Sequence, residues 1–119
     1  MTEREICISY KGARRPDEQT QIMAELNCTD RLEIIKILVK NDVKLARSTV
    51  GYLQRRLDRL DKLIVKKEKK RREAAKDGHL KMQDRMNREI EDGECEYRKI
   101  AEILNTAKAW EAEEWRALR

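Results

Sequence analysis

The sequence has little of what ends helices or fills a thick core. Among its 119 residues there are one proline, four glycines and no phenylalanine, and aromatic residues make up only 4%. So few helix-breaking residues favour long helices over strands joined by tight turns. Charged residues make up 43% of the chain, which indicates narrow apolar seams between helices rather than a thick globular core. An all-α fold is therefore predicted.

Metal-binding and catalytic residue types are also scarce. Cys7, Cys28 and Cys95 lie far apart, and His79 is the sole histidine. This spacing matches neither a disulfide framework nor a zinc site. Acid–base and nucleophilic catalysis need convergent side chains in a water-poor pocket, whereas the carboxylates here have basic residues three or four positions away, as exposed ion pairs do. We expect a non-enzymatic protein without a metal or other cofactor.

Long hydrophobic runs are missing as well. The chain begins Met1-Thr2-Glu3-Arg4-Glu5, which lacks the apolar run of a signal peptide. No stretch approaches the roughly 18 consecutive apolar residues of a membrane span. We therefore expect no membrane partner and a cytoplasmic location.

The first 42 residues divide into an arm and a small head. Ile6, Ile8 and Tyr10 alternate like a short strand and are followed by loop-like residues, so residues 1–15 are interpreted as an N-terminal arm. Pro16 suits the first turn of a helix, and apolar spacing predicts helices over residues 16–27 and 31–40. Residues 16–42 form the predicted head.

An apolar heptad pattern is the strongest structural signal. After Asp42, apolar residues recur in alternating steps of three and four, at Val43, Ala46, Val50, Leu53, Leu57, Leu60 and Ile64. This pattern predicts a coiled-coil helix that continues to Lys76. Asp77-Gly78 predicts a turn. A second seam begins at Met82 and resumes at Tyr97, and Asp92-Gly93 predicts a kink or break within it.

Two long helices joined by a tight turn should fold back on each other. Residues 43–119 are therefore predicted to form an antiparallel helical hairpin (a coiled coil), in which residues whose numbers add to about 155 lie side by side. The hairpin is expected to close within one chain; exchange of its helices between two chains is the alternative. This register places Trp110 beside Leu45, and we interpret Trp110 and Trp115 as core residues at the junction with the head.

Positive charge is concentrated near the predicted turn. Residues 66–89 contain ten basic and five acidic side chains, whereas residues 90–119 have a net charge of −3. The densest run resembles polybasic patches that bind nucleic acid or acidic protein surfaces, and it contains Lys66, Lys67, Lys69, Lys70, Arg71 and Arg72. No aromatic residue interrupts it to stack on bases. A solvated helix face and a nuclear-targeting signal are the alternatives.

One further motif lies between Gln21 and Leu38. A small residue, Ala24, precedes a short turn at Cys28-Thr29, and two apolar residues, Ile34 and Leu38, follow. This spacing resembles the helix-turn-helix of small DNA-binding proteins, although the family usually has glycine where this chain has Asn27-Cys28. The resemblance implies that Arg31 and Lys36 on the second helix lie near DNA.

The arm carries two more basic residues, Arg14 and Arg15, which we expect to assist a groove contact. If the segment is not a helix-turn-helix, its two helices serve only to pack on the hairpin.

The leading functional hypothesis is a non-enzymatic protein that binds nucleic acid or a host nucleoprotein complex. Small size, a helix-turn-helix-like head and a charged hairpin together resemble proteins of phages and mobile elements. One alternative is a protein-directed inhibitor similar in style to phage anti-CRISPR proteins, for which the acidic Glu111, Glu113 and Glu114 are suited. Another is a structural homodimer in which the 43–64 seam lies between two chains.

Overall fold

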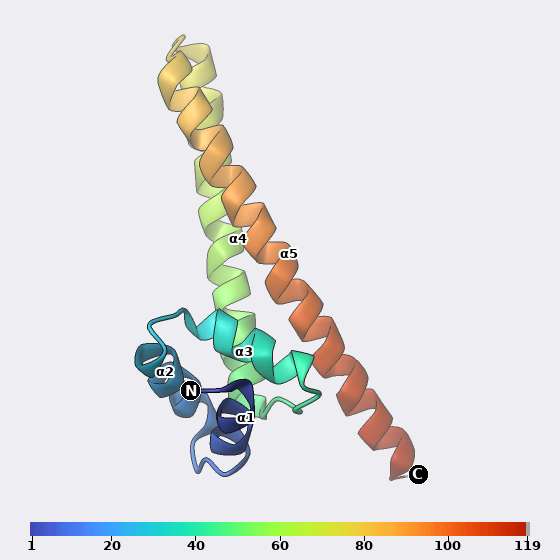
Figure 1. The fold of residues 1–119 in the computed structure, drawn as a ribbon. Coiled ribbons are helices and arrows are strands. Elements are labelled where there is room, and N and C mark those ends of the chain that lie inside the picture. The colour runs from blue at the N-terminus through green and yellow to red at the C-terminus, as the bar shows by residue number, and fades with distance from the viewer. Residues whose placement is uncertain (119) are drawn as a thin grey trace. The chain divides into compact units, whose positions relative to one another are not determined.

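The computed structural model describes residues 1–118, which are helical with no strand (Figure 1). The predicted all-α class is confirmed, and the two long helices, α4 and α5, pack against each other. The five helices, in chain order, are α1 (Glu3–Lys11), α2 (Pro16–Leu26), α3 (Arg31–Lys40), α4 (Arg47–Lys76) and α5 (Leu80–Ala117).

The described residues form two compact units. The head unit consists of residues 1–53 together with residues 102–118, and the hairpin unit consists of residues 54–101. Helices α1, α2 and α3 therefore lie wholly in the head unit, whereas α4 and α5 each contribute to both units.

The strand-like interpretation of the first residues is wrong, because they form helix α1. Ile6 and Tyr10 are both buried, whereas Ile8 is 61% exposed. A spacing of four residues is one helical turn, so the buried pair defines a helix face that the short alternation concealed. Thr2 begins the helix, since its Oγ1 accepts a hydrogen bond from the Glu5 N–H at 3.2 Å. The predicted arm is thus part of the packed head.

Helices α2 and α3 match their predicted positions, and both end in the same way. At the end of α3 the Val43 N–H bonds to the Leu38 carbonyl at 2.9 Å and the Asp42 N–H to the Val39 carbonyl at 3.1 Å. Asp42 has a φ of 57°. These two bonds around a left-handed residue form a Schellman motif. The motif satisfies carbonyls that a helix end leaves without partners.

The same motif ends α2 and α4. Cys28 is the left-handed residue after α2, with a φ of 51°, and Gly78 is the left-handed residue after α4, with a φ of 72°. The 6→1 bonds run from Thr29 N–H to the Ala24 carbonyl and from His79 N–H to the Ala74 carbonyl, both at 2.9 Å. Cys28 therefore adopts the conformation for which glycine is the usual residue. The predicted turn at Asp77-Gly78 is confirmed.

The core of the head unit is formed where α1, α2 and α3 pack pairwise. Its buried residues are Ile6, Cys7, Tyr10, Met23, Ala24, Ile34, Leu38 and Val43. The prediction that the long helix begins at Val43 is wrong, because α4 begins at Arg47. Val43 completes the end of α3 instead, so the chain leaves helical geometry for the next few residues.

In the hairpin unit, the predicted antiparallel pairing is confirmed by contacts between the helices. Lys67 meets Glu89 and Arg56 meets Glu96, so the paired residue numbers add to 156 and 152. Buried Met86, Ile90 and Ile100 lie on α5 at the predicted seam positions, whereas Met82, the predicted start of this seam, is exposed. The finer description of this packing as a coiled coil stays a prediction.

Helix α5 runs through Gly93 without the predicted break. A Cβ atom at Gly93 would lie 3.1 Å from Cγ1 of Ile64 and 3.8 Å from Cδ1 of Leu60. Gly93 is therefore a seam residue at which α4 approaches α5 closely, and its lack of a side chain makes room for Ile64.

Candidate nucleic-acid interface

The hairpin part of α4 has a larger net positive charge than the whole chain. Residues 54–76 contain eleven basic and four acidic side chains, a net charge of +7, whereas the whole chain has a net charge of +5. These side chains leave the helix in all directions, so their orientation decides which of them can meet a partner.

Three of the eleven basic side chains turn toward α5. The Arg56 guanidinium donates to the Glu96 carboxylate, with Nε at 3.0 Å from Oε1. The Lys67 ammonium lies 3.8 Å from the Glu89 carboxylate. Arg71 Nη1 donates to Asn87 Oδ1 at 3.4 Å. Lys67 and Arg71 were predicted contact residues, and both are half-buried, so they are partly engaged within the hairpin.

The other eight basic side chains of this segment are exposed. We call them the basic stripe; they are Arg55, Arg59, Lys62, Lys66, Lys69, Lys70, Arg72 and Lys76. Their spacing of mostly three and four residues places them on one broad face of the helix. At about 1.5 Å per residue the stripe extends for roughly 32 Å. Within residues 1–118, none of the eight takes part in an ion pair.

Four members of the basic stripe were missed by the sequence interpretation. That interpretation followed the contiguous run from Lys66 to Arg72, whereas Arg55, Arg59, Lys62 and Lys76 lie outside the run. Their signal was periodic: basic residues recur every three or four positions on the side opposite the apolar seam. Lys66, Lys69, Lys70 and Arg72 belong to both the run and the stripe.

Acidic side chains reduce the positive charge of this face without removing it. Asp58, Asp61 and Glu73 are exposed on the same helix. Asp58 accepts a hydrogen bond from Gln54 Nε2 at 3.4 Å. The eight exposed cations against three exposed carboxylates leave a net charge of +5 on the outer side of α4. An anionic partner is favoured along its length.

Arg31, which the helix-turn-helix resemblance places near DNA, is enclosed within the head unit. Its Nε donates to Thr20 Oγ1 and its Nη2 to the Asp17 carbonyl, both at 2.7 Å. Its guanidinium lies 3.6 Å from the centroid of the Tyr52 ring, an attractive cation–π arrangement. The side chain is only 15% exposed. These contacts give Arg31 a structural role that joins α2, α3 and the start of α4.

Helix α3 also lacks the free cationic face that a recognition helix presents to DNA. Four of its ten residues are buried: Leu32, Ile34, Ile35 and Leu38. Lys36 pairs with Glu33 at 3.1 Å, and Lys40 pairs with Glu3 at 3.2 Å. The helix-turn-helix interpretation of the head stays a prediction, and this charge arrangement gives it no support.

The two arginines between α1 and α2 remain on the surface. Arg14 and Arg15 are exposed, and Arg15 Nη1 lies 3.4 Å from Glu18 Oε1. An exposed ion pair of this kind is weak, so it leaves both side chains accessible. They lie in the head unit, outside the basic stripe.

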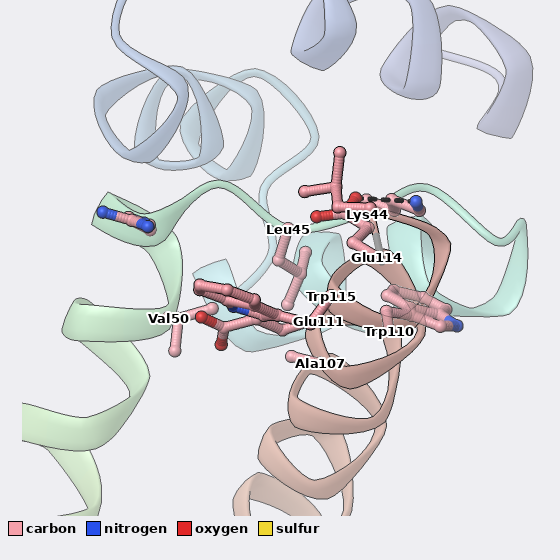
Figure 2. Close-up of a pocket in the computed structure, with 10 residues that line it drawn as sticks. Lys44, Leu45, Val50, Ala107, Trp110, Glu111, Glu114 and Trp115 are labelled. Carbon is pink, nitrogen blue, oxygen red and sulfur yellow. Dashed lines mark hydrogen bonds and ion pairs between the residues drawn. The ribbon is translucent and has the colours of Figure 1, made fainter.

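The head unit also carries an apolar groove of about 420 Å³ (Figure 2). It lies between the beginning of α4, with the residues just before it, and the last turns of α5. Its lining residues are Lys44, Leu45, Arg47, Val50, Ala107, Trp110, Glu111, Glu114, Trp115 and Leu118. Lys44 Nζ donates to Glu114 Oε1 at 2.7 Å across its edge.

The two tryptophans of this groove differ in exposure. Trp110 is half-buried and lines the groove together with Leu45. Trp115 is 64% exposed, so its interpretation as a core residue is wrong. The prediction failed because α5 continues for two turns beyond Trp110 and its last residues are exposed.

Comparisons with known protein families, with curated proteins and with solved structures find no match to this chain. In residues 1–118, no helix combines the length and apolar character needed to cross a membrane. The same residues contain no cluster of three or more side chains suited to hold a metal ion. A functional proposal therefore depends on the chain's own geometry.

Proposed function

We propose that this protein is a non-enzymatic nucleic-acid-binding protein that holds the phosphate backbone along the basic stripe. One observation carries the proposal: eight exposed cations, none of them in an ion pair within residues 1–118, lie on one face of a single helix. A line of unpaired cations attracts a linear polyanion, because each phosphate contact releases condensed counterions.

The length of the basic stripe suits a duplex. Double-helical DNA rises about 3.4 Å per base pair, so a face of roughly 32 Å runs beside about nine base pairs. Lysine and arginine side chains are long and flexible enough to adjust to phosphates that are not in perfect register with the helix. The supporting helix α5 holds α4 through the Arg56–Glu96 and Lys67–Glu89 pairs, which keeps the other basic side chains directed outward.

The stripe favours binding that does not depend on base sequence. Its face carries no aromatic side chain that stacks on a base. Phosphate contacts fix position and affinity but read no sequence. We therefore place this activity in the hairpin unit and assign no base-reading role to Arg31, which is enclosed in the head unit.

A salt titration of duplex binding tests the proposal. Fluorescence anisotropy of a labelled 20-base-pair random duplex is measured with the full chain at several salt concentrations. Affinity should fall steeply with salt, with a log–log slope of about −0.9 for each phosphate contacted. Undetectable binding at low salt would refute the proposal.

Matched double variants test whether the outward cations are the ones that matter. Lys66→Gln/Lys70→Gln removes two members of the basic stripe, and Lys67→Gln/Arg71→Gln removes two inward side chains from the same turns. Both variants lower the net charge by two. The outward variant should weaken binding at least threefold more and reduce the slope by about two. Equal losses in the two variants would contradict the proposed face.

The groove of the head unit supports a second candidate function, contact with another protein, as in an inhibitor of a host defence complex. Trp115 and Leu118 are 64% and 83% exposed, and Glu111 and Glu114 line the same groove. Exposed tryptophan beside apolar residues is typical of protein-contact surfaces. Affinity purification after nuclease treatment tests this function, with the Trp115→Ala variant as the control. A partner protein that co-purifies with both the wild type and the variant would refute the role of the groove.

A structural homodimer has less support, because the seam of α4 packs against α5 of the same chain. Such a dimer would have to form through another surface or by exchange of the hairpin helices between two chains. Light scattering that returned a monomer at all concentrations would exclude it.

A further inference from the structure

The tip of the hairpin unit, residues 77–82, exposes two large apolar side chains. Leu80 is 71% exposed and Met82 is 43% exposed. Both lie in the first turn of α5, directly after Gly78 reverses the chain. The packing of the hairpin does not require these side chains to be apolar, since buried Ala74 and Met86 close the seam just below them.

The tip surface carries two shallow, open depressions. A depression of about 610 Å³ is lined by residues 78–82 and Arg85. A neighbouring depression of about 390 Å³ shares His79, Met82 and Arg85 with it and reaches Lys70 on α4. Met82 therefore lies between two open spaces. Its unbranched side chain has room to change rotamer when a partner approaches.

Basic side chains surround this apolar tip. Lys76, Lys81 and Arg85 are exposed around it. Lys70 belongs to the basic stripe and also lines the second depression. The basic stripe thus extends to the tip through Lys70 and Lys76. A polyanion that follows the stripe would approach Leu80 and Met82.

Acidic groups near the tip are fewer and partly engaged. Glu73, Asp77 and Asp84 are exposed. The Glu89 carboxylate forms ion pairs with Arg85 Nε at 3.4 Å and with Lys67 Nζ at 3.8 Å. Residues 70–89 as a whole contain seven basic and four acidic side chains, and this balance favours an anionic partner.

We propose that Leu80 and Met82 form an apolar wedge that enters between adjacent base pairs of a duplex bound along the basic stripe. This inference rests on the proposed function and specifies its substrate as deformable double-helical nucleic acid. Leucine and methionine are among the side chains that proteins insert between base steps, where they unstack the bases and kink the duplex. Pyrimidine–purine steps open most easily, so duplexes with a central TA or CA step should be preferred.

An anionic membrane surface is the other partner that accepts apolar side chains among cations. The stripe follows a single helix for roughly 32 Å up to the tip, which suits a linear phosphate backbone, so the duplex is the partner proposed.

The test uses the full chain and a duplex with 2-aminopurine beside a central TA step. Unstacking of this base raises its fluorescence. The wild-type protein should raise it at least twofold at saturation, and Leu80→Ala/Met82→Ala should lose at least half of that increase. Leu63→Ala is the control, since Leu63 is 46% exposed but lies on α4 away from the tip. Circular dichroism verifies that each variant stays helical.

Each outcome separates the wedge from the proposed function. Duplex binding without a rise in fluorescence would overturn the wedge and leave phosphate binding intact, whereas no duplex binding would overturn both. Equal fluorescence for the wild type and the tip variant would also overturn the wedge. A last experiment uses vesicles of phosphatidylserine and phosphatidylcholine. If the wild type sediments with the vesicles, Leu80→Ala/Met82→Ala does not, and the duplex shows no fluorescence change, the tip binds a lipid surface instead.

Discussion

The hydroxyl of Tyr10 lies 2.7 Å from Oγ1 of Thr49, and both residues are buried. The same hydroxyl accepts a hydrogen bond from the N–H of Ala46 at 2.8 Å. Tyr10 thereby supplies an acceptor to the residue just before α4, at a helix end where backbone N–H groups lack partners within the helix. One side chain of α1 therefore positions the start of the long helix.

Replacing Tyr10 with phenylalanine should destabilise the protein by about 1–3 kcal/mol, because the Ala46 N–H and the Thr49 hydroxyl would both lose this partner. The change retains the aromatic ring in the core. Urea denaturation followed by circular dichroism measures the free energy of unfolding. Thr49→Val is the control and should cost less, since the Tyr10 hydroxyl keeps the Ala46 N–H. Equal stability of Tyr10→Phe and the wild type would contradict this role.

The left-handed backbone at Cys28 predicts a stabilising substitution. A residue with a Cβ atom is strained by roughly 1–2 kcal/mol at a φ of 51°, and glycine is not. Glycine has a larger unfolded-state entropy, which offsets part of the gain. Cys28→Gly should therefore raise the free energy of unfolding by about 0.5–1 kcal/mol. Cys28→Ala keeps the Cβ atom and should give no comparable gain; if alanine stabilised as much as glycine, backbone strain would not be the cause.

Much of the fold was predictable because its signals are local. The seam from Val50 to Ile64 repeats at helical spacing, and Asp77-Gly78 is a turn sequence that needs no tertiary information. The sequence did not indicate helix α1, because Ile6 and Tyr10 form a buried face only when α2 and α3 pack on them. Likewise, Gly93 resembles a helix breaker until Ile64 is placed beside it.

The candidate interface was predicted in part. A dense run of lysine and arginine is visible in the sequence, but its division into outward and inward residues depends on α5. Lys67 and Arg71 turn inward because Glu89 and Asn87 lie opposite them. The internal contacts of Arg31 depend equally on tertiary structure, since Tyr52 lies 21 positions further along the chain.

The close approach at Gly93 gives a steric prediction. A leucine there would place side-chain atoms against Ile64, whose Cγ1 lies only 3.1 Å from the position that a Cβ atom would take. Gly93→Leu should destabilise the protein by about 1–3 kcal/mol. The second substitution Ile64→Ala should recover part of the loss, because it removes the clashing atoms. Thermal unfolding of the single and double variants checks this. If the stability losses of the two single variants simply add in the double variant, the two positions do not interact.

Glu3 gives a pH prediction. Hydrogen bonds from Asn41 and then Lys40 lower the pKa of the Glu3 carboxyl below its ordinary value. A carboxyl with a lowered pKa stabilises the fold above its ordinary pKa, and that contribution disappears as the pH falls through the lowered pKa. Glu3→Gln should therefore reduce stability at neutral pH and make it less dependent on pH in the acidic range. Urea midpoints across that range test this; parallel profiles for the variant and the wild type would contradict it.

Measurements on a conservative variant of Arg31 distinguish a structural role of this residue from a role in binding. Lysine retains its positive charge but lacks the planar group that donates to both Thr20 and the Asp17 carbonyl. Arg31→Lys should lower the free energy of unfolding by about 2 kcal/mol, since hydrogen bonds to charged groups are each worth roughly 1.5–3 kcal/mol. Its affinity for duplex, measured below the unfolding transition, should equal that of the wild type. A variant with unchanged stability and weakened duplex binding would instead place Arg31 at the nucleic acid.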